Sequence, residues 1–255
     1  MPRAASKQVQ LSPGCLPLRE LLAEVETARW TRWEQAQQSF LDAIWRFDEN
    51  FTAGRATQGD NQNGKGDSFG DLICGLLERC SGKDLNYRPA VPGRIFRSHA
   101  LDAAYPASGV VEVFIETKTA GAPKTPRNPR QRNPLGRAGS SDLDKRVKEA
   151  GLKTIDLKAE WARIEGAGSG PAGDLIAWLR RAKPSCHILF AVRVVDSNDL
   201  HQTIKKAQSA AQLMDGCGLF CYQPTGCAYE PLEVPLELEM DRAVTRICEQ
   251  LRALP

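Results

Sequence analysis

The apolar run CHILFAVRVV at residues 186–195 constrains the fold more than any other segment of this chain. Its length and its content of Ile, Val and Phe are typical of a buried strand. A helical pattern follows at 198–214, NDLHQTIKKAQSAAQLM, and a second strand-like run, GLFCYQP, follows at 218–224. A strand, a helix and a strand in succession predict a sheet that is covered by helices.

Helical spacing of apolar residues recurs on both sides of this unit. Residues 16–50 predict one long or two consecutive helices, and a further helix is expected from about Asp67 to a stop at Gly82. Between them, FTAGRATQGDNQNGKG is rich in Gly, Asn and Gln and predicts a loop. More helices are expected in DLDKRVKEAG, TIDLKAEWARIE, GDLIAWLRRA and MDRAVTRICEQLRAL. The sequence therefore predicts an α/β fold with a central mixed β-sheet flanked by helices.

The distribution of apolar residues and cysteines indicates the compartment. The first residues, MPRAASKQVQLSPG, contain no apolar signal-peptide core, and the longest apolar run is too short to cross a bilayer. We expect a cytoplasmic protein with no membrane contact and with its eight cysteines reduced. Cys217, Cys221 and Cys227 cluster without a CxxC pair or a nearby histidine, so small core residues are expected there rather than zinc ligands.

A glycine-rich segment imitates a phosphate-binding loop. Residues 59–65, GDNQNGK, match the first seven positions of that motif, but Gly66 stands where a magnesium-binding Ser or Thr is required. The preceding segment also fails to predict the buried strand that the motif needs. No nucleotide cofactor is expected.

The segment VVEVFIETK at residues 110–118 alternates between apolar and polar positions. One face carries Val111, Val113 and Ile115, and the other carries Glu112, Phe114, Glu116 and Lys118. Two interpretations are open. The polar side chains form the solvated face of an amphipathic strand, where Glu and Lys are ladder partners, or they form a catalytic edge.

The triplet Glu116-Thr117-Lys118 matches the pattern acid–any–lysine, which carries little information alone. About one or two such triplets arise by chance in a chain of this composition, and a second one, Asp156-Leu157-Lys158, falls in a segment expected to be helical. The first triplet differs in its setting, because a strand places residues i and i+2 on the same face. An earlier strand-like run, RIFRSHALD, ends in Asp102, and the turn-like AAYPASG joins the two runs.

A helix with acidic residues (67–78), a strand that ends in Asp102 and a strand that ends in Glu-x-Lys together resemble the PD-(D/E)xK nuclease superfamily. Within that superfamily, the type II restriction endonucleases are most similar in size and layout. The resemblance covers residues 60–120, with 186–223 as a looser fit. Leu101 stands where the motif that names the superfamily has proline.

The resemblance implies a single nuclease domain over residues 1–255. Its restriction-endonuclease-like core would span 60–223, after a helical N-terminal part (1–55) and before a C-terminal extension (224–255). It also implies Asp102 and Glu116 as Mg²⁺ ligands and Lys118 as the catalytic lysine. Three further acids are expected to support these residues from nearby: Asp71, Glu78 and Glu112.

These residue types suit phosphodiester hydrolysis. Two carboxylates that converge from adjacent strands can hold Mg²⁺, which prefers oxygen ligands. The metal ion would activate a bound water and polarise the phosphoryl oxygen. A neighbouring lysine would orient the attacking water and offset the negative charge that develops.

A basic segment follows the candidate strand directly. From residue 124 to residue 137 it has five cations and no acid, and its candidate DNA-binding residues are Lys124, Arg127, Asn128, Arg130, Arg132 and Arg137. Arginine suits phosphates and guanine edges, and asparagine suits adenine. One interpretation is a disordered basic loop, and the other is a loop that orders when it contacts DNA.

The expected function is Mg²⁺-dependent, sequence-specific cleavage of double-stranded DNA, as in a restriction-modification system. A homodimer is expected, because a two-fold protein reads a palindromic site symmetrically. Two alternatives remain: a structure-specific or repair nuclease of the same superfamily, and a DNA-binding protein without catalytic activity.

Overall fold

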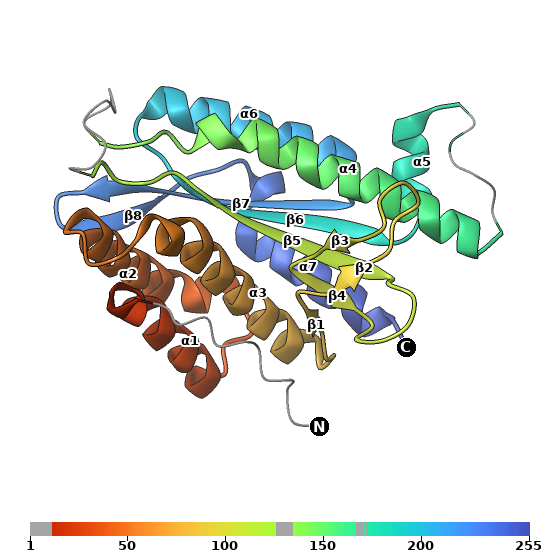
Figure 1. Cartoon of the computed structure of the whole chain (residues 1–255), viewed down its shortest axis with the longest axis horizontal. Coiled ribbons are helices and arrows are strands. Elements are labelled where there is room, and N and C mark those ends of the chain that lie inside the picture. Colours follow the sequence, from red (N-terminus) through yellow and green to blue (C-terminus); the bar gives the residue numbers. More distant parts are fainter. Residues whose placement is uncertain (1–11, 126–134, 167–170, 172) are drawn as a thin grey trace.

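A computed structural model describes residues 12–125, 135–166, 171 and 173–255. Its centre is a six-stranded sheet in the order β1-β4-β5-β6-β7-β8, and β2 and β3 form a separate two-stranded hairpin (Figure 1). The strands are β1 (Asn86–Tyr87), β2 (Ala90–Val91), β3 (His99–Ala100), β4 (Ala103–Tyr105), β5 (Val113–Ala120), β6 (Ser185–Arg193), β7 (Gly216–Thr225) and β8 (Ala228–Leu232).

Helices cover both faces of this sheet. They are α1 (Leu16–Ala28), α2 (Trp33–Thr52), α3 (Lys65–Ser81), α4 (Ser140–Ile164), α5 (Leu175–Arg181), α6 (Ser197–Leu213) and α7 (Met240–Ala253), with short helical turns at Pro13–Cys15, Asp60–Gly64 and Leu236–Leu238. In Figure 1, α4 and α6 lie on one side of the sheet, and α1, α2, α3 and α7 lie on the other. The predicted mixed sheet flanked by helices is confirmed.

The middle of the sheet is parallel. β5 pairs with β6, and β6 pairs with β7, in parallel registers, with α4 and α6 as the crossover helices. The outer strands β4 and β8 pair antiparallel to β5 and β7. The apolar run at 186–195 supplies β6, the central strand, whose residues from 186 to 193 are all buried. Its prediction as a buried strand is confirmed.

Alternating side chains of β5 enter two different cores. Val113 and Ile115 belong to the core beneath α1, α2, α3 and α7, and Phe114 and Ala120 belong to the core beneath α4 and α6. This alternation follows from the two-residue period of a strand. The polar residues of the second face therefore lie on the side that α4 covers.

The N-terminal region contains two consecutive helices, as predicted, but the expected loop at 51–66 is largely wrong. Helical backbone resumes soon after Thr57, and it continues through Asp60–Gly64 into α3. The cause is a reciprocal cap: the Thr57 amide donates to the Asp60 carboxylate, and the Asp60 amide donates to the Thr57 hydroxyl. This cap outweighs the low helix propensity of the Gly and Asn residues that follow. The predicted stop at Gly82 is confirmed.

The strand expected in RIFRSHALD is also wrong. Only His99 and Ala100 are extended there, as β3, while Ala103–Tyr105, expected to be a turn, forms β4. Ala103 and Ala104 are fully buried in the two cores, one on each side of the sheet. Their small side chains allow both helical layers to pack closely at this edge. Packing therefore overrides their weak strand propensity.

Two cysteines depart from the expectation that all thiols are reduced. Cys80, at the end of α3, and Cys248, in α7, are joined by a disulfide. The pairing follows from the packing of α3 beside α7, which sequence spacing does not reveal. Cys217 and Cys221 are small core residues, as predicted, whereas Cys227 is exposed. None of the helices in the described part of the chain combines the length and apolar character needed to cross a bilayer.

Candidate active site

Asp102, Glu116 and Lys118 meet around a single ammonium group. The Nζ atom of Lys118 lies 2.8 Å from Oε2 of Glu116 and 3.1 Å from Oδ2 of Asp102. β5 places Glu116 and Lys118 on the same face, two residues apart. The structure thus brings together the three residues that the sequence singled out as a catalytic set.

Asp102 reaches this position from the start of β4, not from the end of a longer strand. It precedes Ala103, which forms the first residue pair between β4 and β5 with Ile115. Its Oδ2 atom accepts hydrogen bonds from the Thr117 amide at 2.6 Å and from the Thr117 hydroxyl at 3.1 Å. The side chain of Asp102 thereby replaces a backbone carbonyl as the partner of β5.

Glu116 is held from two directions and is almost completely buried. Its side chain is 1% exposed, and it pairs with Lys118 on its own strand. Nζ of Lys153, on α4, donates to both carboxylate oxygens at 2.9 and 3.0 Å. The same Nζ donates to the carbonyl of Ala100 at 2.6 Å. The interpretation of Glu112, Glu116 and Lys118 as a solvated strand face is therefore wrong for Glu116, because α4 covers it.

Lys153 carries no mark in the sequence that identifies it as a site residue. It lies in a segment correctly predicted as helical, but that helix carries several lysines, and helical periodicity alone does not tell which of them faces β5. The decisive information is the packing of α4 over β5, which is a tertiary property.

The electrostatics of Lys118 favour its charged form. Burial acts to lower the pKa of Lys118, but the charges of Glu116 and Asp102 and the hydrogen bonds to both carboxylates outweigh burial and raise the pKa above its usual value. Lys118 is therefore an ammonium ion at neutral pH. It can donate hydrogen bonds and offset negative charge, but it cannot act as a base there.

The cluster lies at a strand edge between two helices. Pairing between β4 and β5 ends at Ala103↔Ile115, whereas pairing between β5 and β6 continues to Ala120↔Val192. On the face opposite α4, α3 approaches β5 at Gly70, where an added Cβ atom would lie 3.0 Å from the Thr117 hydroxyl. A side chain at this position would require the Thr117 side chain or the nearby backbone to shift by a few tenths of an ångström.

The three acids expected to support the site lie at different places. Asp71 pairs with Arg88 at 2.8 Å, and Glu78 accepts hydrogen bonds from the Leu85 amide and the Tyr87 hydroxyl, so both stabilise the segment after α3. Their charges and that of Asp102 all raise the pKa of buried Cys74, after burial itself, so these carboxylates share one neighbourhood. None of the described contacts of Asp71 or Glu78, however, is made with Glu116.

Glu112 does not approach the site. It precedes β5 and pairs with Lys183 at 3.3 Å. It is four residues from Glu116, which corresponds to about 13 Å along an extended strand. The expectation that Glu112 supports the site from nearby is corrected: it lies just before the N-terminal end of β5.

The second acid–any–lysine triplet is structural. Asp156 and Lys158 are both fully buried in α4. Asp156 accepts hydrogen bonds from the segment before β3, and Lys158 binds the Leu179 and Ala182 carbonyls and Asp215. A helix separates residues i and i+2 by about 200°, so the two side chains face different surroundings.

The segment that imitates a phosphate-binding loop is helical, and its lysine is engaged elsewhere. Lys65 is 2% exposed and pairs with Asp48 at 2.7 Å. Asp48 in turn accepts a hydrogen bond from the Tyr229 hydroxyl at 2.6 Å. Lys65 therefore joins α3 to α2 inside the protein.

The basic segment is described only at its two ends. Lys124 is exposed, and Arg137 pairs with Asp142 and forms a backbone bridge with Ala122. Arg127, Asn128, Arg130 and Arg132 lie outside the described residues. The bridge brings the two ends of the segment together just beyond the C-terminal end of β5, the strand that carries Glu116 and Lys118.

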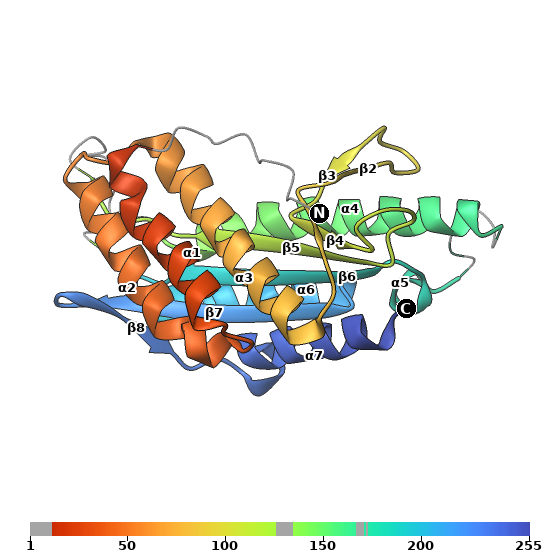
Figure 2. The same ribbon diagram turned by 90° about the horizontal axis from the view of Figure 1, so that it is seen from below.

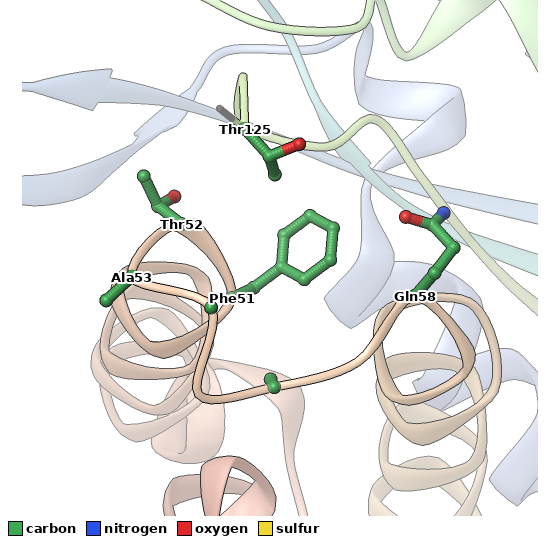
Figure 3. A pocket seen from close by; sticks show the side chains of 7 residues that line it. Phe51, Thr52, Ala53, Gln58 and Thr125 are labelled. Atoms are coloured by element: carbon green, nitrogen blue, oxygen red, sulfur yellow. The ribbon is translucent and has the colours of Figure 1, made fainter. Parts of the chain in front are cut away.

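A pocket of about 350 Å³ lies beside the same segment. Figure 3 shows Phe51, Thr52, Ala53 and Gln58, near the connection between α2 and α3, with Thr125 opposite them. Its lining includes none of Asp102, Glu116, Lys118 and Lys153, so this pocket is separate from the carboxylate cluster.

A divalent cation is compatible with the pair of carboxylates. Within the described ranges, no group of three or more His, Cys, Asp or Glu side chains forms a metal cluster. Mg²⁺, however, is commonly bound through one or two carboxylates, and water completes its shell. Among the described contacts, Asp102 accepts hydrogen bonds only at Oδ2, and its side chain is 35% exposed, so Oδ1 is available to a cation. Glu116 already holds cationic groups at both oxygens.

Comparison of the chain with protein-family models, with curated proteins and with solved structures found no match.

Proposed function

We propose that this protein is a Mg²⁺-dependent endonuclease that cleaves double-stranded DNA at specific sites, as type II restriction endonucleases do. The observation that carries the proposal is the shared ammonium group of Lys118, which contacts Asp102 at 3.1 Å and Glu116 at 2.8 Å. The chain thus places two acids and a lysine at one strand edge, although they come from separate segments of the sequence.

The order of elements also supports the proposal. After α3 and the two-residue strands β1, β2 and β3, the chain enters β4, which begins directly after Asp102, and then β5, which carries Glu116 and Lys118. Apart from these short strands, the order is that of the helix and two strands on which the resemblance to the PD-(D/E)xK nucleases rests. The parallel strands β6 and β7, with α6 between them, correspond to the looser part of that resemblance.

Asp102 and Glu116 would hold Mg²⁺ through their carboxylate oxygens. When bound, this ion would supply an activated water and polarise the phosphoryl oxygen. Lys118 would orient the attacking water through an N–H donor and offset the charge of the phosphorane. The raised pKa of Lys118, which results from the neighbouring carboxylates despite burial, suits this cationic role. Lys153 would hold the Glu116 carboxylate in place.

The proposal includes recognition of a specific DNA site and assembly into a homodimer. The basic segment between residues 124 and 137 leaves the end of β5, so its arginines would follow the DNA backbone beside the cleaved phosphate. A two-fold dimer would bring two such sites to a palindromic sequence and cut both strands.

Digestion of a long DNA of known sequence with the full-length protein and Mg²⁺ tests this function. Discrete fragments that disappear with EDTA are expected for a site-specific endonuclease. Smears or cleavage of branched substrates would instead favour a structure-specific nuclease. A gel shift without cleavage would favour a DNA-binding protein without catalysis. The same protein with Lys118→Met controls for contaminating nucleases.

A further inference from the structure

The tip of the β2–β3 hairpin displays apolar side chains to solvent between two arginines. Ile95 is 72% exposed and Phe96 is 45% exposed, and the flanking Arg94 and Arg97 are also exposed. Figure 2 shows the hairpin standing out from the body of the protein beside α4 and β4. Exposed apolar side chains that are rimmed by charge commonly mark a binding site.

A buried carboxylate fixes this tip in one conformation. Oδ1 of Asp156 accepts the Ile95 amide at 2.6 Å, and Oδ2 accepts the Phe96 amide at 3.0 Å. Oδ2 also pairs with Nε2 of His99 at 2.7 Å. Asp156 is completely buried in α4. Burial of a carboxylate costs free energy unless it is hydrogen-bonded, and here the hydrogen bonds come from the solvent-exposed turn.

Gly93 permits this arrangement. A Cβ atom at this position would overlap the Asp156 carboxylate, so the turn can settle on α4 only with glycine there. The Gly93 amide donates to the Phe96 carbonyl at 3.0 Å and closes the turn. Contacts with α4 therefore fix the conformation in which Ile95 and Phe96 are exposed.

The second strand of the hairpin, β3, ends beside the carboxylate cluster. Ala100 of β3 accepts a hydrogen bond from Lys153, which also binds Glu116, and Asp102 follows two residues later. A DNA strand with its phosphate at Asp102 and Glu116 would therefore pass close to the end of this hairpin. The positive charge of Arg94 and Arg97 matches the charge of the DNA backbone.

We infer that the β2–β3 hairpin enters a groove of the DNA duplex beside the cleaved phosphate. Arg94 and Arg97 bind phosphates on either side of the groove, and Ile95 and Phe96 pack against the bases. Apolar wedges of this kind unstack a base step and bend the duplex. This inference rests on the proposed nuclease function, and it adds a DNA-contacting element with a fixed conformation to that site.

Two double variants test the two parts of this contact. They are made in the Lys118→Met protein, so that the duplex is bound but cut slowly, and binding is measured by fluorescence anisotropy at several salt concentrations. Arg94→Gln with Arg97→Gln should weaken binding and reduce the salt slope by about two units. Ile95→Ser with Phe96→Ser should weaken binding by about tenfold or more and leave the salt slope unchanged. The proposed hairpin–DNA contact requires both losses of affinity. A variant that binds DNA as tightly as the Lys118→Met parent therefore overturns it.

Matched controls separate this inference from the proposed function. Leu236→Ser and Arg242→Gln change an exposed apolar residue and an exposed cation near α7, and neither should alter DNA binding. All four altered hairpin positions are exposed, but the Phe96 ring also contacts the His99 ring at 5.5 Å, so the thermal midpoint of each variant is compared with that of the parent, and binding is compared only between folded proteins. If the wild-type protein cuts DNA while the hairpin variants bind as the parent does, only the inference fails. If the wild-type protein neither binds nor cuts duplex DNA, the proposed function fails.

Discussion

Lys153 of α4 donates hydrogen bonds to both carboxylate oxygens of Glu116 on β5, at 2.9 and 3.0 Å. α4 is the crossover helix that leads from β5 to β6. The candidate site is therefore built from a strand edge and from the helix that covers that strand. A second ammonium group, from Lys118, contacts the same carboxylate. Glu116 thus binds two cationic groups at the place where Mg²⁺ is proposed to bind.

The first prediction concerns competition between Lys153 and Mg²⁺. Because the ammonium group of Lys153 repels a cation at Glu116, Lys153→Met should lower the Mg²⁺ concentration for half-maximal cleavage by about fivefold or more. Titration of Mg²⁺ under single-turnover conditions measures this shift. Lys148→Met, which changes an exposed lysine on the same helix, is the control and should leave the Mg²⁺ requirement unchanged. An unchanged or higher requirement in Lys153→Met would contradict the competition.

The Glu116–Lys118 pair could be predicted because a strand fixes which residues share a face, whatever the tertiary fold. Lys153 could not be predicted, because its role depends on how α4 lies across β5. Asp102 was identified for a partly wrong reason. The sequence predicts it at the end of a strand, but it precedes β4, whose alanines form a strand because their small side chains pack between two helical layers.

The larger elements of the fold could be predicted because their apolar periodicity is long and regular. β6 and α6 have such patterns and formed where expected. The predicted loop after α2 failed because a two-residue cap, Thr57 with Asp60, starts a helix in a sequence of low helix propensity. β8 was missed because its residues 228–232 include a proline and lie on a sheet edge, where one-sided pairing leaves little apolar signal.

A second prediction tests the two carboxylates. Asp102→Asn and Glu116→Gln keep the side-chain volume but remove the charge that would hold Mg²⁺, so both should abolish detectable cleavage and leave DNA affinity within a few-fold of wild type. Glu116→Gln is preferable to alanine, because alanine would leave Lys153 and Lys118 facing a buried cavity. Glu112→Gln, just before the N-terminal end of β5, should cleave normally. Normal cleavage in the Asp102 or Glu116 variant would refute the assignment.

A third prediction concerns stability and pH at Asp156. Asp156→Ala removes the acceptor for His99 and for the amides of Ile95 and Phe96, so it should destabilise the fold by about 3 kcal/mol. Burial acts to raise the pKa of Asp156, but these hydrogen bonds outweigh it and hold the pKa below its usual value. A depressed carboxyl pKa contributes stability above the unfolded-state value, near pH 4, and this contribution is lost as the pH falls through the folded-state pKa.

The stability gap between wild type and Asp156→Ala should therefore be full at neutral pH and should narrow below about pH 4. Urea unfolding at a series of pH values measures it. Single-turnover cleavage at saturating enzyme should remain near wild type, because Asp156 positions the hairpin and is not part of the carboxylate cluster. Complete loss of cleavage in a folded Asp156→Ala protein would mean that Asp156-Leu157-Lys158, and not Glu116-Thr117-Lys118, is the catalytic triplet.

A fourth prediction addresses the basic segment. Replacement of Arg127, Arg130 and Arg132 by alanine should weaken DNA binding and flatten its dependence on salt, by about one slope unit for each phosphate contact that is lost. Anisotropy titrations at several salt concentrations provide both quantities. Arg242→Ala, on α7, removes an exposed cation elsewhere and serves as the control. An unchanged affinity and slope in the triple variant would show that this segment is a tether without DNA contacts.

The last prediction tests Lys118, which decides between a catalytic edge and an ordinary ion pair. If Lys118 only pairs with Glu116 and Asp102, Lys118→Met should affect stability and leave cleavage unchanged. If Lys118 stabilises the transition state, the same change should slow cleavage by several powers of ten at nearly unchanged DNA affinity. Additional Mg²⁺ should not restore the rate, because Lys118 is not a metal ligand.

Single-turnover cleavage at saturating enzyme separates the two cases, because a binding defect disappears under those conditions and a defect in chemistry persists. The thermal midpoint, measured in parallel, reports any loss of the contacts that Lys118 makes at 2.8 and 3.1 Å. Lys118→Arg should keep the positive charge but displace the donor from the water that it orients, so it should restore stability more than rate. A Lys118→Met rate within a few-fold of wild type would return Lys118 to a structural role.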